Sequence, residues 1–336
     1  MNRSAIVTGI GMYVPEKVLT NIEIERLLKR PGTAEWLVKN VGIEKRHIMA
    51  DDETTSDLCT HAGKEALEKA KISSEELDLV ILSSDTPDYL SPATSVVIQD
   101  KLGAVNAGTF DVNAACAGLV TALDIGARYI KTDTEINHVL VIGGYGMTKF
   151  VDWTDHYTCT LFADGAGAIV LSASEEHQGF LASKMTADGS FHDHLGIFVG
   201  GTAEPPTVEA IESHKHHVTF RKRFPPETNL RNWPKITRDC LTKAGYTPED
   251  VDWFFFTQVN LRTIEAVMKE LGAPIEKTHT VMHKWGYTGS ACVPLCMYDA
   301  IDKGKLLPPG HGNGELIALC TSGGGANFAA ATLKWW

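Results

Sequence analysis

The chain of 336 residues is 43% apolar, so it can bury a substantial core as one large or two fused domains, and it is neither disordered nor fibrous. Its 31 Lys and Arg residues are outnumbered by 42 Asp and Glu residues, which gives a formal net charge of -11. This charge argues against general binding to nucleic acid or to an anionic membrane, because both need a basic protein surface.

The cysteines and the amino-terminal segment indicate the compartment. Seven cysteines form an odd, scattered set, which fits a reducing cytoplasm better than a disulfide framework. The apolar segment near the start is broken by Gly9 and Gly11, unlike a signal peptide, and no stretch reaches the roughly 20 apolar residues of a membrane-spanning helix. We therefore expect a soluble, unprocessed, cytoplasmic protein that does not cross a membrane.

An internal repeat organises the chain. Residues 66–82 align without gaps with residues 240–256. Each segment reads as the end of an amphipathic helix, a turn led by Ser or Thr, and a buried strand that follows an Asp. In each half a second helix then ends in Leu-Gly, and an apolar strand, a Gly-rich turn and another strand follow. The chain therefore has two halves with the same order of elements.

This alternation predicts α/β layering, because helices that connect parallel strands cover both faces of a sheet. Two halves related by a pseudo-twofold axis predict two sheets that share central helices. We place the first half at residues 1–176 and the second at residues 239–336. Residues 177–238 are rich in His, Pro and charge and lack a counterpart in the first half, so we expect a lid or insertion with a lead-in helix there.

The most informative cysteine is Cys116, in the segment 110–123. A strand leads through small residues into a helix whose apolar positions recur with a spacing of about 3.6 residues, and Cys116 falls at or just before the first turn. Unpaired N–H groups and the helix dipole at that place favour a thiolate, so we expect a pKa below the ordinary value of about 8.5. A buried packing cysteine is the alternative.

Seven stretches spread along the whole chain share the pattern of one family. They are EWLVKNVGIEKRHI (35–48), SDLCTHAGKEAL (56–67), Cys116, FADGAGAIVLSA (162–173), TADGS (186–190), NLRTIEAVMKELG (260–272) and SGGGANFAAATL (322–333). Together they resemble the ketoacyl-acyl-carrier-protein synthase III family. The resemblance implies a thiolase-like, duplicated αβαβα layered fold. It also implies that the cysteine takes an acyl group from coenzyme A or a carrier protein, and that a second substrate, often a malonyl unit that loses carbon dioxide, attacks the thioester.

The sequence departs from that family at two catalytic positions. Where the family has His-Gln-Ala-Asn this chain has Thr257 at the His position, and where it has His-Gly-Asn-Thr this chain has Tyr287 at the Asn position. A neutral hydroxyl does not take up a proton near pH 7, and the loss of one positioned donor costs about 10²–10³ in rate. The resemblance therefore supports acyl loading on Cys116, with backbone N–H groups of Cys116 and Gly324 as the oxyanion site, more strongly than decarboxylative condensation.

The sequence does not identify which group replaces the missing catalytic base. The candidates are His156, His192, His194 and His283, although a single His is more often structural or solvated. For Tyr287 we expect a hydrogen bond to the acyl oxygen, with a packing role as the alternative.

The resemblance also implies how the thioester binds. Trp36 matches a tryptophan that stacks on the adenine of coenzyme A, and Asn260 and Arg262 match residues at the pantetheine entrance and phosphate region. Two family arginines are replaced by Asn40 and His156. A basic segment from His214 to Arg238 is a candidate for the phosphates or for an acidic carrier protein. Coenzyme A enters as substrate, and no cofactor is expected.

The His-rich run 214–217 suggests a metal, but the sequence has no acid or thiol at ligand spacing, so we predict no metal site. We expect a Cys-dependent acyltransferase, active as a homodimer, with a malonyl-type carbon nucleophile, a non-decarboxylating acceptor or water as acyl acceptor. The alternative is a catalytically silent acyl-binding subunit of a hetero-oligomeric synthase.

Overall fold

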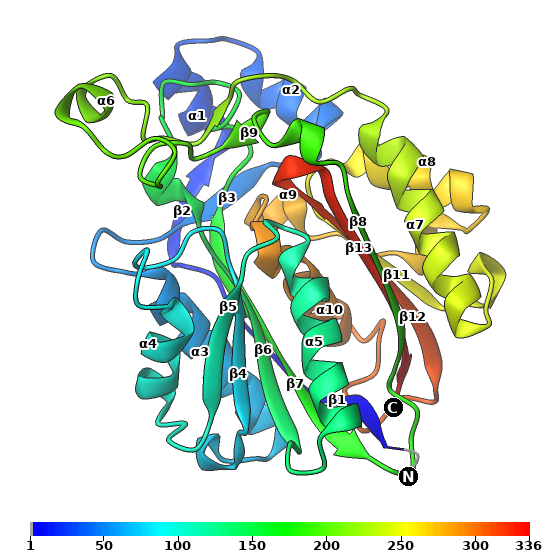
Figure 1. The fold of residues 1–336 in the computed structure, drawn as a ribbon. Coiled ribbons are helices and arrows are strands. Elements are labelled where there is room, and N and C mark those ends of the chain that lie inside the picture. The colour runs from blue at the N-terminus through cyan, green and yellow to red at the C-terminus, as the bar shows by residue number, and fades with distance from the viewer. Residues whose placement is uncertain (1–2) are drawn as a thin grey trace.

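The computed structural model describes residues 3–336 and contains two main sheets arranged side by side (Figure 1). The first sheet has the order β1 (Ser4–Tyr13), β7 (Asp164–Ser174), β6 (His138–Gly146), β4 (Leu79–Ser83) and β5 (Gly108–Val112). The second has the order β8 (Phe180–Ala187), β13 (Asn327–Trp335), β12 (Glu315–Gly323) and β11 (Trp253–Phe256). Two short ribbons pair β2 (Lys17–Thr20) with β3 (Lys45–Ile48), and β9 (Leu195–Gly196) with β10 (Thr219–Phe220).

Helices complete five layers. The outer face of the first sheet carries α3 (Thr55–Ala70) and α4 (Thr94–Leu102), and that of the second carries α7 (Thr228–Ala244) and α8 (Leu261–Leu271) (Figure 1). Between the sheets lie α5 (Gly118–Thr132) and α10 (Cys292–Asp302). The shorter helices are α1 (Asn21–Leu28), α2 (Thr33–Asn40), α6 (Val208–Glu212) and α9 (Met282–Trp285). The predicted duplicated αβαβα layering is confirmed.

The two repeated sequence segments form the same hydrogen bonds in the structure. Ser73 and Glu76 form a capping box before β4, and Thr247 and Asp250 form the same box before β11. The Asp that follows each box also has one role in both halves, because its carboxylate accepts a backbone N–H at the start of the neighbouring strand. Asp78 accepts from His138 at 2.9 Å, and Asp252 accepts from Leu316 at 2.8 Å. Local polar contacts thus set the strand register in both halves.

The segment predicted as an insertion with a lead-in helix, residues 177–238, begins with a strand of the second sheet and ends in a helix. Residues 180–187 form β8, which pairs antiparallel with β13 as β1 pairs with β7, so they complete the second sheet. At the other end α7 begins at Thr228 and covers that sheet. Phe180 and Ala182 are buried, whereas the strand from Lys184 onward is exposed, so only the first half of this edge strand belongs to the core. The true insertion lies between β8 and α7.

The middle layer explains why the sheets stay together. The α5 residues Leu119, Val120, Leu123, Ala127 and Ile130 are all at most 2% exposed, as the predicted helical spacing requires. The amino-terminal end of α5 lies at a cavity that residues of both halves line. Within residues 3–336, no helix has the length and apolar character needed to span a bilayer.

Candidate active site

A strained turn between β5 and α5 presents Cys116. The helix begins at Gly118, so the cysteine lies two residues before it, which confirms its predicted place at a helix start. The side-chain oxygen of Asn113 accepts the N–H of Ala115 at 3.1 Å. Ala115 has a φ of 47°, a left-handed conformation that a residue with a Cβ adopts only when its surroundings impose it. The turn holds the sulfur at the end of the helix rather than in the packed core.

Cys116 faces a cavity of about 610 Å³ that both halves of the chain line. The first half contributes Cys116 and Tyr145, and the second contributes Thr257, Tyr287 and the glycine-rich turn at 323–325. All three residues predicted to be catalytic, and Gly324 with them, therefore meet at one site although up to 208 positions separate them (324 − 116). Their individual chemical roles stay predictions.

Tyr287 lies beside the cysteine on the cavity wall. Its hydroxyl acts to lower the pKa of the Cys116 thiol, and its ring is 6% exposed and packs between Tyr145 and Phe162, with ring centroids 6.3 and 5.9 Å away. Backbone hydrogen bonds from Tyr287 to Leu161 at 3.1 Å and from Ala163 to Tyr287 at 2.9 Å fix the residue. Burial, with Cys116 next, raises the pKa of Tyr287 well above its ordinary value, so the phenol stays protonated and acts as a donor.

The predicted low pKa of Cys116 is wrong. Burial is the largest influence and raises the pKa of the Cys116 thiol well above its ordinary value, and the nearby Asp85 carboxylate adds to this shift. The hydrogen bond from Tyr287 acts in the opposite direction. Removal of the sulfur from water outweighs the effect of the helix start, so the resting site holds a thiol and loading requires its deprotonation.

Replacing Tyr287 by Phe should raise the pKa of the Cys116 thiol further, because the donor that stabilises the thiolate is lost. A hydrogen bond to a charged group is worth about 1.5–3 kcal/mol, or about one pKa unit or more. Iodoacetamide alkylation at neutral pH, followed by mass spectrometry, should therefore slow about tenfold. Tyr145→Phe is the matched control, because it removes a hydroxyl from the same cavity wall. An alkylation rate that is equal in Tyr287→Phe and wild type would show that the hydrogen bond does not stabilise the thiolate.

Thr257 ties two loops together. Its hydroxyl oxygen accepts the backbone N–H of Ser322 at 3.0 Å and is nearly fully buried. Ser322 begins the turn whose next residue, Gly323, lies against the Cys116 backbone: a Cβ at Gly323 would be 2.7 Å from the Cys116 nitrogen. The Asn327 amide donates to the carbonyl of Gly324 at 2.8 Å. Thr257 thus holds the glycine-rich turn beside the sulfur and keeps its own hydroxyl proton available for a substrate.

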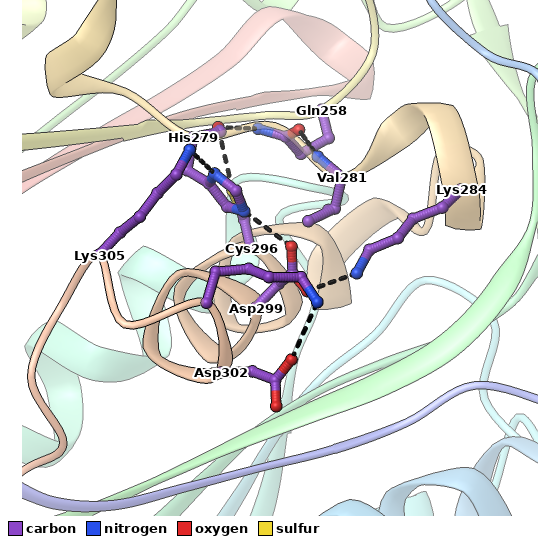
Figure 2. A network of polar contacts seen from close by, with 9 residues as sticks. Gln258, His279, Val281, Lys284, Cys296, Asp299, Asp302 and Lys305 are labelled. Atoms are coloured by element: carbon purple, nitrogen blue, oxygen red, sulfur yellow. Dashed lines mark hydrogen bonds and ion pairs between the residues drawn. The ribbon is translucent and has the colours of Figure 1, made fainter.

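A buried polar network supports the Thr257 loop from behind (Figure 2). The Gln258 side chain accepts from Val281 at 2.9 Å and donates to the carbonyl of His279 at 3.4 Å. The His279 ring lies 2.7 Å from Asp299, which also binds Lys284. Burial alone would raise the pKa of Asp299, but the hydrogen bonds from Lys284 and His279 hold it below its ordinary value. Asp299 is therefore ionised and paired in the folded protein.

Breaking this pair by Lys284→Met should lower the free energy of unfolding at pH 7 by about 3 kcal/mol, because Asp299 keeps a buried charge with one partner fewer. Since the folded pKa of Asp299 is depressed, the contribution is present above the unfolded pKa and is lost as pH falls through the folded pKa. Urea unfolding at pH 7 and below pH 4 measures both effects. In Lys303→Met, which breaks an exposed pair with Asp302, the change should stay below about 0.5 kcal/mol. Equal losses in the two variants would contradict the prediction.

A second cavity, of about 880 Å³, adjoins the first. It shares the lining residues Leu161, Phe220 and Phe224 with the Cys116 cavity, so the two cavities lie next to each other. Trp36, which is 57% exposed, and His156 line it as expected for the mouth of the site. Four cationic side chains line this cavity: Arg30, Arg221, Lys222 and Arg223. None of its described lining residues is acidic.

Asn260 and Arg262 lie elsewhere. The Asn260 side chain caps α8 by accepting the N–H of Thr263 at 3.1 Å and donates to the carbonyl of Asn40 at 3.1 Å. Arg262 donates to the carbonyl of Lys39 at 3.0 Å and lines a separate surface hollow between α2 and α8. Neither Asn260 nor Arg262 is among the residues that line the Cys116 cavity or the neighbouring 880 Å³ cavity. Their predicted contact with coenzyme A therefore stays a prediction without geometric support.

The candidate histidines do not converge on the sulfur. His192 lines the outer part of the Cys116 cavity and is exposed, and His156 lies in the entrance. His194 packs on Phe224, with ring centroids 5.3 Å apart, and His283 is exposed on α9. None of the four takes the place of the family's catalytic His beside Cys116 within the described cavity wall.

The fold brings an acid to the His-rich run. Ligand atoms of Asp152, His214 and His217 lie within 4.8 Å of one another, although 62 residues separate Asp152 from His214 (214 − 152). The sequence has no acid at ligand spacing from the His-rich run, but the fold places one beside it, so the spacing in the sequence is not an argument against a metal. Exposed polar groups often cluster in this way without binding an ion, so the absence of a metal stays a prediction.

Among the polar residues of the cavity wall that the sequence did not point out are Asp85 and Asn113. Asn113 precedes the small-residue turn, where an Asn that hydrogen-bonds its own backbone is a recognisable signal. Asp85 follows a buried strand parallel to the one before Cys116. Carboxyl ends of neighbouring parallel strands meet at one edge of a sheet. The position of Asp85 after its strand therefore indicates that it lies near Cys116.

Two family models and several curated relatives match this chain. The family model for 3-oxoacyl-[acyl-carrier-protein] synthase III matches residues 110–189, and the model for the C-terminal part of that family matches residues 241–335. The beta-ketoacyl-[acyl-carrier-protein] synthase III of Xanthomonas euvesicatoria is 37% identical over 333 residues, 98% of each chain. That of Syntrophomonas wolfei is 36% identical over 329 residues, 98% of this chain and 97% of the relative.

Solved structures give the same answer. The 3-oxoacyl-[acyl-carrier-protein] synthase III of Aquifex aeolicus superposes with a TM-score of 0.87 at 34% identity, over 98% of this chain and all of the other. The priming beta-ketosynthase of the R1128 polyketide pathway has a TM-score of 0.88 at 30% identity, over 99% of this chain and 97% of the other. The chain therefore belongs to the 3-oxoacyl-[acyl-carrier-protein] synthase III family, the acyl-transferring condensing enzymes with a thiolase-like fold.

Proposed function

We propose that Cys116 accepts an acyl group from a thioester of coenzyme A or of a carrier protein and passes it to a second substrate. The observation that carries this proposal is the adjacency of the two cavities, which places a hollow lined by four cations next to the cavity that Cys116 lines. A silent acyl-binding subunit is not favoured, because the chain matches condensing enzymes over its whole length and keeps the cysteine in an open cavity.

The cations on the wall of the second cavity support a phosphate-bearing donor. Arg221 forms a two-pronged pair with Glu204 at 2.7 and 2.8 Å, and Lys222 pairs with Asp193 at 2.5 Å. These pairs are exposed, so a phosphate can compete for the cations at small cost. Trp36 lines the same hollow and is 57% exposed, so its ring is accessible for stacking on a base. We therefore propose coenzyme A or phosphopantetheine thioesters as donors, with no retained cofactor.

Loading is one substitution at the acyl carbon. The Cys116 sulfur loses its proton and attacks the thioester carbonyl, the bond from this carbon to the donor sulfur breaks, and the donor thiolate takes up a proton. The negative charge on the carbonyl oxygen would lie among the backbone N–H groups of Cys116 and Gly324 and the Tyr287 hydroxyl. Thr257 holds this arrangement through Ser322. By family resemblance we also propose a cytoplasmic homodimer, which light scattering during gel filtration tests.

Intact-protein mass spectrometry tests the proposal. The full chain is incubated with acetyl-, butyryl-, octanoyl- and malonyl-coenzyme A and, separately, with acyl carrier protein bearing the same acyl groups. A mass gain of one acyl group, located on the Cys116 peptide after digestion, is the expected result and ranks the donors. No gain with any donor of either kind would overturn the proposal.

A further inference from the structure

One carboxyl group, that of Asp85, lies on the wall of the Cys116 cavity. Asp85 follows β4 by two residues, Cys116 follows β5 by four, and Tyr145 lies near the end of β6. These strands run parallel, with Ser83 of β4 in register with both β5 and β6, so their carboxyl ends meet at one edge of the sheet. This is why Asp85 lines the cavity together with Cys116 and Tyr145.

The backbone around Asp85 is held on both sides. The N–H of Ser84 donates to Val112 at 3.3 Å, and the N–H of Thr86 donates to the Ser84 hydroxyl at 3.0 Å. The Thr86 hydroxyl oxygen accepts from Gly146 at 2.8 Å. The Oδ1 atom of Asp85 is buried without a hydrogen-bond partner among the described residues. A rigid loop thus presents an unpaired carboxyl oxygen at the site.

The charges around Asp85 suit a base. The other titratable groups on the cavity wall are Cys116, Tyr145, Tyr287 and the exposed His192, and no Lys or Arg is among the described lining residues. With no cation to stabilise the ionised form, burial raises the pKa of Asp85 to about 6. An acid with such a pKa is ionised at pH 7 and still basic enough to take a proton in a transition state.

We propose that Asp85 is the general base of the second half-reaction, and that the acyl acceptor is an uncharged molecule with an O–H, N–H or S–H group. This inference rests on the loading of Cys116 proposed above. Asp85 takes the proton of the acceptor, whose lone pair attacks the acyl carbon on Cys116. The bond from that carbon to the Cys116 sulfur breaks, and the proton on Asp85 returns to the released thiolate, so the site is restored.

The same carboxylate disfavours a malonyl acceptor. A malonyl carboxylate would have to enter a cavity that already holds an ionised Asp85 and has no lining cation to balance two negative charges. Thr257 and Tyr287, in place of the usual His and Asn, are neutral donors that cannot compensate. An uncharged protic acceptor meets neither obstacle, and its proton gives Asp85 a role.

The test separates loading from transfer. Wild type and Asp85→Asn are acylated with the best donor from the panel above, freed of excess donor, and followed by mass spectrometry from pH 5 to 8 in buffer alone, with glycerol, or with malonyl-coenzyme A. The acyl adduct of Asp85→Asn is measured first, so that the transfer rate is compared only between fully acylated proteins. The loss of the acyl group from Asp85→Asn to water and glycerol should be about 10²–10³-fold slower, as expected for removal of a general base.

Three further readouts distinguish a base from a structural residue. The wild-type rate should rise through the pKa of Asp85 near 6, and Asp85→Asn should lack this rise. Asp85→Glu should restore part of the rate and of the pH dependence. Asp88→Asn is the matched control, since Asp88 lies in the same loop but accepts the backbone N–H of Ser56 at 3.0 Å and does not line the cavity.

Each outcome decides the matter. If wild type loads and Asp85→Asn transfers the acyl group with the wild-type rate and pH profile, the role of Asp85 is overturned while the proposed function stands. Release of a ketoacyl product from malonyl-coenzyme A at a rate above that of hydrolysis would overturn the acceptor class. If wild type itself gains no acyl group from any donor, both this inference and the proposed function fail.

Discussion

Replacing Cys116 by Ala is expected to abolish the acyl adduct and to lower turnover by at least about 10⁴-fold, because the variant has no atom that can carry the acyl group. The cavity wall would otherwise be unchanged, since the side chain that remains is no larger than the one removed. Adduct mass and the release of free coenzyme A, measured with a thiol reagent, check the two parts of this expectation.

A second buried cysteine serves as the control. Cys320 lies in β12, and its sulfur contacts the carbonyl of Trp233 at 3.9 Å rather than the cavity. Cys320→Ala should therefore keep the full acyl adduct. An adduct of equal size in Cys116→Ala and wild type would place the nucleophile elsewhere in the chain.

Replacing Gly323 by Ala is expected to lower turnover by about 10²-fold or more and the free energy of unfolding by about 1–3 kcal/mol. Its backbone is extended, with φ of -141°, so any residue can adopt the conformation and the effect is purely steric. The added methyl carbon would lie 2.7 Å from the Cys116 nitrogen and 2.8 Å from the Ala114 oxygen. Both neighbours are backbone atoms, so the turn must move away from the cysteine.

The adjacent glycine gives a matched comparison for stability. At Gly324 an added Cβ would meet only ordinary contacts, 3.5 Å from the Leu195 oxygen and 3.8 Å from the Ala115 Cβ. Gly324→Ala should unfold in urea at the wild-type midpoint, whereas Gly323→Ala should unfold at a lower one. Equal midpoints and wild-type turnover in Gly323→Ala would show that the two segments are not in close contact.

Several features of the fold were readable from short stretches of sequence. The repeat of 66–82 in 240–256 became two strands preceded by the same capping box, because caps and periodicity depend on residues that are close in the chain. The position of Cys116 before α5 followed from the same kind of signal. The departures at Thr257 and Tyr287 were equally plain, since each lies in a recognisable motif.

Other features depend on contacts between distant parts of the chain. β8 lies in the segment predicted to be an insertion, and its pairing with β13 makes it a strand of the second sheet. The pKa of Cys116 is raised because burial outweighs the helix start, and burial is a property of the assembled cavity. Asp152 meets His214 and His217 across 62 residues, a proximity that spacing within the His-rich run cannot reveal.

The sequence by itself thus determined the duplicated α/β architecture, the cysteine at a helix start and the two altered catalytic positions, because local patterns encode elements and motifs. Only the tertiary structure decided which groups share the cavity. It placed Asp85 beside Cys116 and Arg262 away from the entrance, since parallel strand ends and helix packing, rather than neighbours in sequence, set those distances. Desolvation in that cavity then decided the protonation of its acid and its thiol.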